Sequence, residues 1–152
     1  MNLELRDVRR APGDDKYLWT PFELSDDFTP DWWDRVPYLD DDPHYVQVLH
    51  DGAEVARVEL DHDFRGSAHV GAPRLGDQAL EIQFLEVADP HRGQGIGTEV
   101  VRLLVEQYPS HRLLAMSEDA DGFWSSLGSD RYDHRDGPQR YRPLFVAPPV
   151  RP

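Results

Sequence analysis

The segment from Leu80 to Glu99 constrains the fold of this chain most strongly. It reads LEIQFLEVADPHRGQGIGTE, so an apolar stretch runs into a turn with three glycines. Apolar residues then recur with the spacing of one helical stripe from Val100 to Tyr108. We therefore predict a strand over residues 79–88, a glycine-rich turn and a helix over residues 97–108. A strand that passes through such a turn into an amphipathic helix is typical of α/β proteins.

The other elements are predicted to be short. Further strands are expected over residues 1–10, 45–49, 55–60, 112–116, 131–134 and 139–146, and a second helix over residues 119–127 that ends at Gly128. Asp51-Gly52 indicates a hairpin turn between the second and third strands. A loop of only two residues does not separate the faces of these strands cleanly, so a longer turn is the alternative. Residues 64–78 are predicted to form a loop.

The proline-rich segment 11–42 is predicted to contain only short helical turns. Thr29-Pro30 has the pattern of an N-cap followed by a first helical residue. Acidic pairs and runs at residues 14–15, 26–27 and 40–42 are expected to lie in solvated loops.

The glycine turn has the chemistry of a phosphate site. N–H groups at the first turn of a helix have no partner in the helix, and they lie at its positive end. Glycine allows the backbone to approach a diphosphate closely, and Arg92 adds charged donors. A dinucleotide fingerprint would need glycine where Thr98 stands, and a P-loop would need a lysine that this turn lacks. The alternative is a tight turn without a ligand.

Two motifs carry a resemblance to a known family. Arg92-x-x-Gly95-x-Gly97 follows the central strand, and Ala120 to Gly128 reads ADGFWSSLG. These motifs and their spacing resemble those of the GCN5-related N-acetyltransferases, the GNAT superfamily. The resemblance implies an α/β, GNAT-like fold with a mixed central sheet flanked by helices. It covers residues 1–146 as one acyl-CoA-binding domain, with residues 147–152 as a proline-rich tail.

The resemblance also implies acetyl-CoA as cofactor. The diphosphate would lie on the turn, and pantetheine would lie beside the end of the strand, where this strand splays from the next one. An N–H group near Val87 would stabilise the charge that develops on the thioester oxygen. The residues expected to contact the cofactor are Leu85, Glu86, Val87, Arg92, Gly93, Gln94, Gly95, Ile96, Gly97, Thr98, Ser117 and Trp124.

Amine acylation needs a group that removes a proton, because an alkyl ammonium is mostly protonated at neutral pH. Glu81 stands at the same distance before the glycine motif as the base of the histone-acetylating members, so we rank it first and Glu86 second. The alternative is that both are outward-facing strand charges. The tyrosine that returns a proton to the CoA thiolate in the family is replaced by Trp124. Its indole N–H is no useful acid. Tyr132 or Tyr141 could supply the proton, or the thiolate leaves unaided.

The amino-acid composition limits the classes of molecule that this protein is expected to bind. The chain has 16 basic and 29 acidic residues among 152, a formal charge of −13, and no cysteine. Such a surface repels nucleic acid and favours a cationic amine, either a small molecule or a protein amine. No apolar run reaches the length of a membrane span, and residues 1–10 do not resemble a signal peptide, so we expect a cytoplasmic protein that does not act at membranes. Its histidines do not form a metal signature, so no metal site is expected. A homodimer stays open.

The sequence thus predicts an acyl-CoA-dependent N-acetyltransferase that works by direct attack of a primary amine. The first alternative is a GNAT-like domain that binds CoA or acyl-CoA as a sensor or interaction module without turnover, because Trp124 and Ser129 depart from the family pattern. The second is a structural protein whose glycine turn holds nothing.

Overall fold

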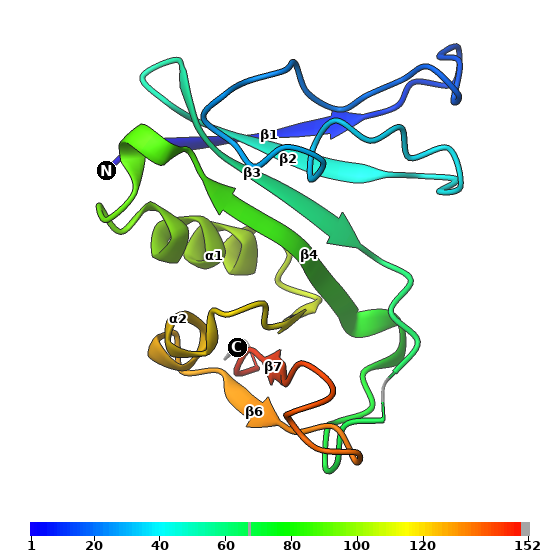
Figure 1. The fold of residues 1–152 in the computed structure, drawn as a ribbon, viewed down its shortest axis with the longest axis vertical. Helices are drawn as coiled ribbons and strands as arrows, with labels where there is room; N and C mark the ends of the chain where they lie inside the picture. The colour runs from blue at the N-terminus through cyan, green and yellow to red at the C-terminus, as the bar shows by residue number, and fades with distance from the viewer. Residues whose placement is uncertain (67, 150–152) are drawn as a thin grey trace. The chain divides into compact units, whose positions relative to one another are not determined.

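The structure is a computed structural model that describes residues 1–66 and 68–149. Its described residues form seven strands in the order β1-β2-β3-β4-β5-β7-β6 and the helices α1 and α2 (Figure 1). β4 pairs with β5 in parallel, whereas β1–β2, β2–β3, β5–β7 and β6–β7 are antiparallel pairs, so the sheet is mixed, as predicted. None of the helices in the described residues is long and apolar enough to cross a bilayer.

The chain divides into two compact units, residues 1–60 with 84–101 and residues 61–83 with 102–152. In the first unit, β1, β2 and β3 form an antiparallel meander. The strand bounds are Leu3–Arg9 for β1, His44–His50 for β2, Ala53–Asp61 for β3 and Ala79–Val87 for β4, whose second half belongs to this unit.

The turn between β2 and β3 is the predicted hairpin. Asp51 and Gly52 both have positive φ, 51° and 81°, and the turn contains only these two residues. The longer turn is therefore not needed. The register of β2 against β3 shifts between Val48 and Leu49.

The segment between β1 and β2 contains short turns, as predicted, including one helical turn in which Trp19 N–H donates to Asp15 O at 3.0 Å. Residues 10–43, all of which are described, contain turns and bends but no helix. The predicted N-cap at Thr29 is wrong, because its hydroxyl and its amide both bond to Glu86. Aromatic side chains hold this segment against the strands: Phe28, Trp33 and Tyr45 are buried together, and Phe22 packs edge-on against two of them.

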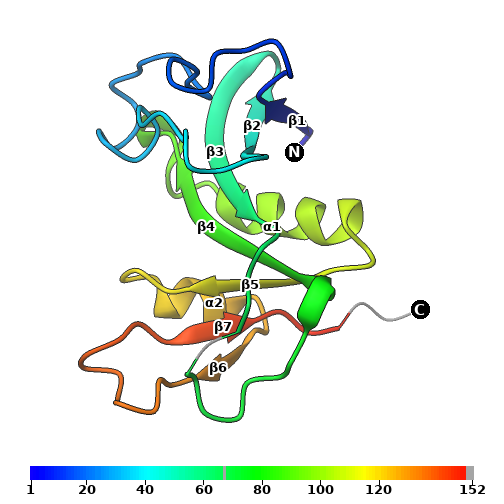
Figure 2. The same cartoon turned by 90° about the vertical axis from the view of Figure 1, so that its right-hand side faces the viewer.

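In the second unit, β4 pairs with β5, and β7 lies between β5 and β6 (Figure 2). The predicted strand 112–116 is confirmed as β5, Arg112–Met116. The closing pair is confirmed with other bounds, Asp130–Tyr132 for β6 and Leu144–Val146 for β7. Ala79, Leu114, Leu144 and Val146 form one buried apolar cluster of this unit. Of the predicted tail, residues 150–152 lie outside the described residues.

Both predicted helices are present. Helix α1 spans Ile96–Gln107, and its apolar stripe is buried at Val100, Val101 and Leu104. Helix α2 spans Asp121–Ser126, shorter than predicted, and Gly128 after it has a positive φ of 77°, as a helix C-terminal glycine should.

Candidate functional site

The glycine turn between β4 and α1 has a conformation that side chains rarely adopt. Gly93 and Gly95 have φ angles of 76° and 78°, in the left-handed region. A Cβ added to either glycine would meet no atom of the described chain within 4 Å. These glycines are therefore required by backbone conformation, and the space before them is open.

The first turn of α1 supplies donors at this opening. Glu99 N–H donates to Gly95 O at 3.2 Å, the first i to i−4 bond at this end of the helix. The N–H groups of Ile96, Gly97 and Thr98 precede it and have no partner within the helix. Ile96 is buried and anchors the turn, while Arg92 to Gly95 are exposed. Open space, glycine backbone and the positive end of a helix fit a diphosphate.

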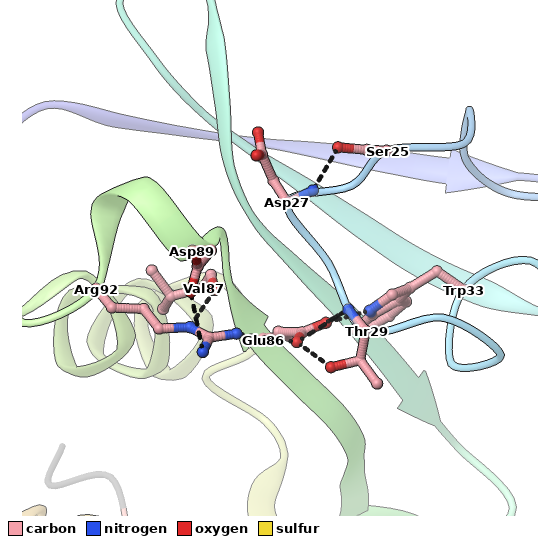
Figure 3. A network of polar contacts seen from close by, with 8 residues as sticks. All are labelled: Ser25, Asp27, Thr29, Trp33, Glu86, Val87, Asp89 and Arg92. Carbon is pink, nitrogen blue, oxygen red and sulfur yellow. Dashed lines mark hydrogen bonds and ion pairs between the residues drawn. The ribbon is translucent and has the colours of Figure 1, made fainter.

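Arg92 is held by the protein itself (Figure 3). Its Nε donates to Val87 O at 3.2 Å, one terminal nitrogen lies 3.3 Å from Asp89, and the other donates to Glu86 at 3.2 Å. The side chain was expected only as a donor to the diphosphate, which stays a prediction. In the structure, the Arg92 side chain also connects the turn to β4 through its bonds to Val87 and Glu86.

Glu86 is a buried carboxylate with 7% of its surface exposed. Its Oε1 accepts hydrogen bonds from Thr29 N–H and Trp33 Nε1–H, both at 2.8 Å. Its Oε2 accepts from Arg92, the Thr29 hydroxyl and, at 3.1 Å, the Thr29 N–H (Figure 3). A carboxylate whose two oxygens are engaged in this way does not fit a base that must reach an incoming ammonium. These contacts favour a positioning role for Glu86, and its predicted roles as second candidate base and cofactor neighbour stay predictions.

The neighbouring residues of β4 differ from Glu86 in burial. Leu85 and Val87 are half-buried, as an accessible strand end requires. The N–H of Ala88 donates to Val55 O at 2.8 Å, so this amide is already paired. Leu85 and Val87 stay the predicted neighbours of pantetheine.

Glu81 belongs to the second unit and has a different environment. Burial raises its pKa above the ordinary value, and the nearby charge of Asp61 raises it further. A hydrogen bond from Gln83 at 3.4 Å and the charge of Arg142 act in the opposite direction. A carboxyl with a raised pKa is closer to the pH at which a general base works best.

The candidate proton donors also lie in the second unit. Tyr132, on β6, is half-buried and packs against the buried apolar cluster of Ala79, Leu114, Leu144 and Val146. Tyr141 is 49% exposed, and its ring stacks on His134 with a centroid distance of 4.0 Å. Tyr132 stays the predicted acid.

Ser117 and Trp124 are both buried in the second unit, with 2% and 9% of their surfaces exposed. The Ser117 hydroxyl accepts a hydrogen bond from Ala120 N–H at 3.1 Å, which orders the residues before α2. Trp124 packs edge-on against Phe123. Their predicted contacts with the cofactor stay predictions.

Sequence reasoning missed Thr29 and Trp33. They stand 57 and 53 residues before Glu86, and no local pattern in the sequence links them to it. Within the described part of the chain, no group of three or more His, Asp or Glu side chains is arranged to hold a metal ion.

Comparison with known proteins gives the following similarities. The profile of the Acetyltransferase (GNAT) family matches residues 5–128. An acetyltransferase structure from Thermus thermophilus is 15% identical and has a TM-score of 0.54, covering 72% of this chain and 66% of its own. No curated protein matches the sequence.

Two similar structures were solved with coenzyme A. N-acetylglutamate synthase from Neisseria gonorrhoeae, complexed with coenzyme A and L-arginine, is 17% identical with a TM-score of 0.53, covering 70% of this chain and 25% of its own. The N-acetyltransferase YlbP from Bacillus subtilis, in complex with coenzyme A, is 17% identical with a TM-score of 0.50, covering 68% of this chain and 67% of its own. At these identities the likeness concerns the fold.

Proposed function

The chain belongs to the Acetyltransferase (GNAT) family, and we propose that it transfers an acetyl group from acetyl-CoA to a primary amine by direct attack. One observation carries this proposal: the glycine turn at the start of α1 is open, exposed and lined with backbone donors. The similar structures solved with coenzyme A support the same cofactor.

The residues of the turn, Arg92 to Thr98, would hold the diphosphate through their N–H groups, and Leu85 and Val87 would contact pantetheine. Ser117 and Trp124 are proposed as further cofactor neighbours. When bound, acetyl-CoA supplies an acetyl group that is activated as a thioester. The protein's own part is to bind, to exclude water and to remove one proton from the amine.

We assign proton removal to Glu81. Its raised pKa makes its carboxylate a stronger base than an exposed glutamate. A neutral amine is the nucleophile, so the ammonium must lose its proton before or during attack. Tyr132 is proposed as the acid that protonates the departing thiolate.

The formal charge of −13 favours a cationic acceptor. We expect polyamines and other cationic primary amines to give a higher kcat/KM than amino acids with a net negative charge. Part of this preference should decline as salt is added, because charges in solution are screened over about 8 Å at physiological ionic strength. A panel of amines, assayed by thiol release, measures it; a preference for anionic amino acids would contradict the proposed acceptor class.

The same assay separates the enzyme from its alternative. Release of free CoA thiol that depends on both acetyl-CoA and an amine is expected from an N-acetyltransferase. A thermal shift with CoA but no thiol from any amine of the panel would instead indicate a binding module. That reading is favoured by Trp124, which cannot act as the family's tyrosine acid. The cytoplasmic location, the absence of nucleic-acid and membrane partners and the state of assembly stay predictions.

A further inference from the structure

Glu86 connects two segments of the first unit that are distant in sequence. From one side, Thr29 donates its N–H and its hydroxyl, and Trp33 donates its indole N–H. From the other side, Arg92 of the glycine turn donates a guanidinium N–H. Figure 3 shows these donors converging on the one carboxylate. A single side chain therefore joins residues 29–33 to the turn.

The contacts of Glu86 with Thr29, Trp33 and Arg92, called the junction below, are buried, so they matter for stability. Glu86 and Trp33 are 7% and 3% exposed. A buried carboxylate needs its donors, because a charge left without them pays the full penalty of its removal from water. Residues 29–33 and Arg92 thus bond to the same buried carboxylate. Loss of a donor on one side therefore weakens the hold of Glu86 on the other side.

A backbone contact runs parallel to the junction. Asp89 N–H donates to Asp27 O at 3.0 Å, so the residues that lead into the glycine turn also rest on the segment before Thr29. Asp89 in turn lies 3.3 Å from a terminal nitrogen of Arg92. Residues 27–33 have no helix or strand of their own. They gain order from these contacts and from the burial of Phe28 and Trp33.

We propose that Glu86 is a positioning residue that acts through Arg92. It holds the guanidinium against β4, and it makes the shape of the Arg92–Thr98 turn depend on residues 27–33. Residues outside the glycine motif would then set the affinity for the diphosphate. The ligand in this inference, the diphosphate of CoA, rests on the proposed function. The coupling between residues 27–33 and the turn does not.

The first test uses Glu86→Gln and calorimetric titration of CoA. Glutamine keeps one oxygen for Thr29 N–H and Trp33 Nε1–H, but it places an amide nitrogen, a donor, where Oε2 met Arg92. We expect the Kd for CoA to rise about tenfold, as for loss of a hydrogen bond to a charged group. In an Arg92→Gln background the same substitution should have no further effect on Kd, because Glu86 acts through Arg92. Glu86→Gln with unchanged Kd overturns the inference.

The second test needs no ligand and uses a variant that keeps its aromatic packing. Trp33→Phe removes one indole N–H that bonds to Glu86. The matched control is Trp32→Phe. Trp32 is the preceding residue in the chain, and its own ring packs on Phe84 with a centroid distance of 4.9 Å. We expect amide hydrogen exchange of residues 92–98, followed by mass spectrometry, to be several times faster in Trp33→Phe than in Trp32→Phe.

The two tests fail separately from the proposed function. If wild-type protein binds no CoA, the proposed function is wrong, while exchange in the free protein still decides the coupling. Exchange of the turn in Trp33→Phe no faster than in Trp32→Phe overturns the inference, whatever the titration gives. If Glu86→Gln does not fold, the tryptophan pair carries the decision.

Discussion

We expect the replacement of Glu81 by glutamine to lower kcat by about 10²–10⁴-fold, the contribution typical of a general base. The reason is that glutamine keeps the shape and the contact with Gln83 but cannot accept a proton. Thiol release from acetyl-CoA with a saturating amine measures the effect. Glu106→Gln is the matched control, because this carboxylate is 61% exposed on the last turns of α1 and pairs with Arg102. A loss of less than about threefold in Glu81→Gln would remove this residue from the catalytic machinery.

The pH dependence gives an independent view of Glu81. Because burial raises its pKa, the base becomes active above the ordinary range of a glutamate, and the wild-type rate should rise as pH passes through that raised value. Deprotonation of the amine adds a second rise at higher pH. The lower rise should disappear from the residual activity of Glu81→Gln, while the upper one stays.

As pH rises through the pKa of Glu81, the contribution of this group to stability should fall while activity rises. The folded state holds the Glu81 proton more tightly than the unfolded chain does, so this group contributes stability below its unfolded pKa, and that contribution is lost as pH rises through the folded pKa. At pH 8 the wild-type protein therefore carries the cost of a partly buried charge. We expect urea unfolding at pH 8 to give Glu81→Gln a free energy of unfolding at least equal to that of wild type. A clear loss of stability at pH 8 would show that the carboxylate is structurally required.

Gly95→Ala is expected to raise the Kd for CoA about 10- to 100-fold, the loss of one or two hydrogen bonds to a charged phosphate. Alanine disfavours the φ of 78°, so the backbone shifts and the N–H groups of Ile96 and Gly97 turn away. The added Cβ also stands in the open space that the diphosphate needs.

Gly52→Ala is the matched control for this substitution. Gly52 has a φ of 81° in the β2–β3 turn, and its Cβ would likewise meet nothing within 4 Å of the described chain. Both variants should lose about 1–2 kcal/mol of stability from the strained backbone. Only Gly95→Ala should lose CoA affinity. Equal affinities in the two variants would mean that the turn does not bind the diphosphate.

Local patterns predicted the elements that local chemistry determines. The β2–β3 hairpin follows from Asp51-Gly52, and α1 follows from the spacing of Val100, Val101 and Leu104. The turn before α1 was predicted from its three glycines, and Gly93 and Gly95 adopt the positive φ angles that glycine readily allows. These features depend on residues a few positions apart, which a single sequence displays.

Features that depend on distant residues could not be predicted. Thr29-Pro30 has the local pattern of a helix start, yet Glu86, 57 residues away, takes both donors of Thr29. The same carboxylate was a candidate base because the sequence shows its position on the strand, but not the five hydrogen bonds that it accepts. For Glu81, the sequence indicated the residue, while the rise in its pKa required the folded environment.

Calorimetric titration of the wild-type protein with coenzyme A, and in parallel with pantetheine, tests the phosphate-binding turn most directly. Saturable heat with coenzyme A and much weaker binding of pantetheine, which lacks the diphosphate, is the predicted result. No heat with coenzyme A, or equal affinity for the two compounds, would contradict the account.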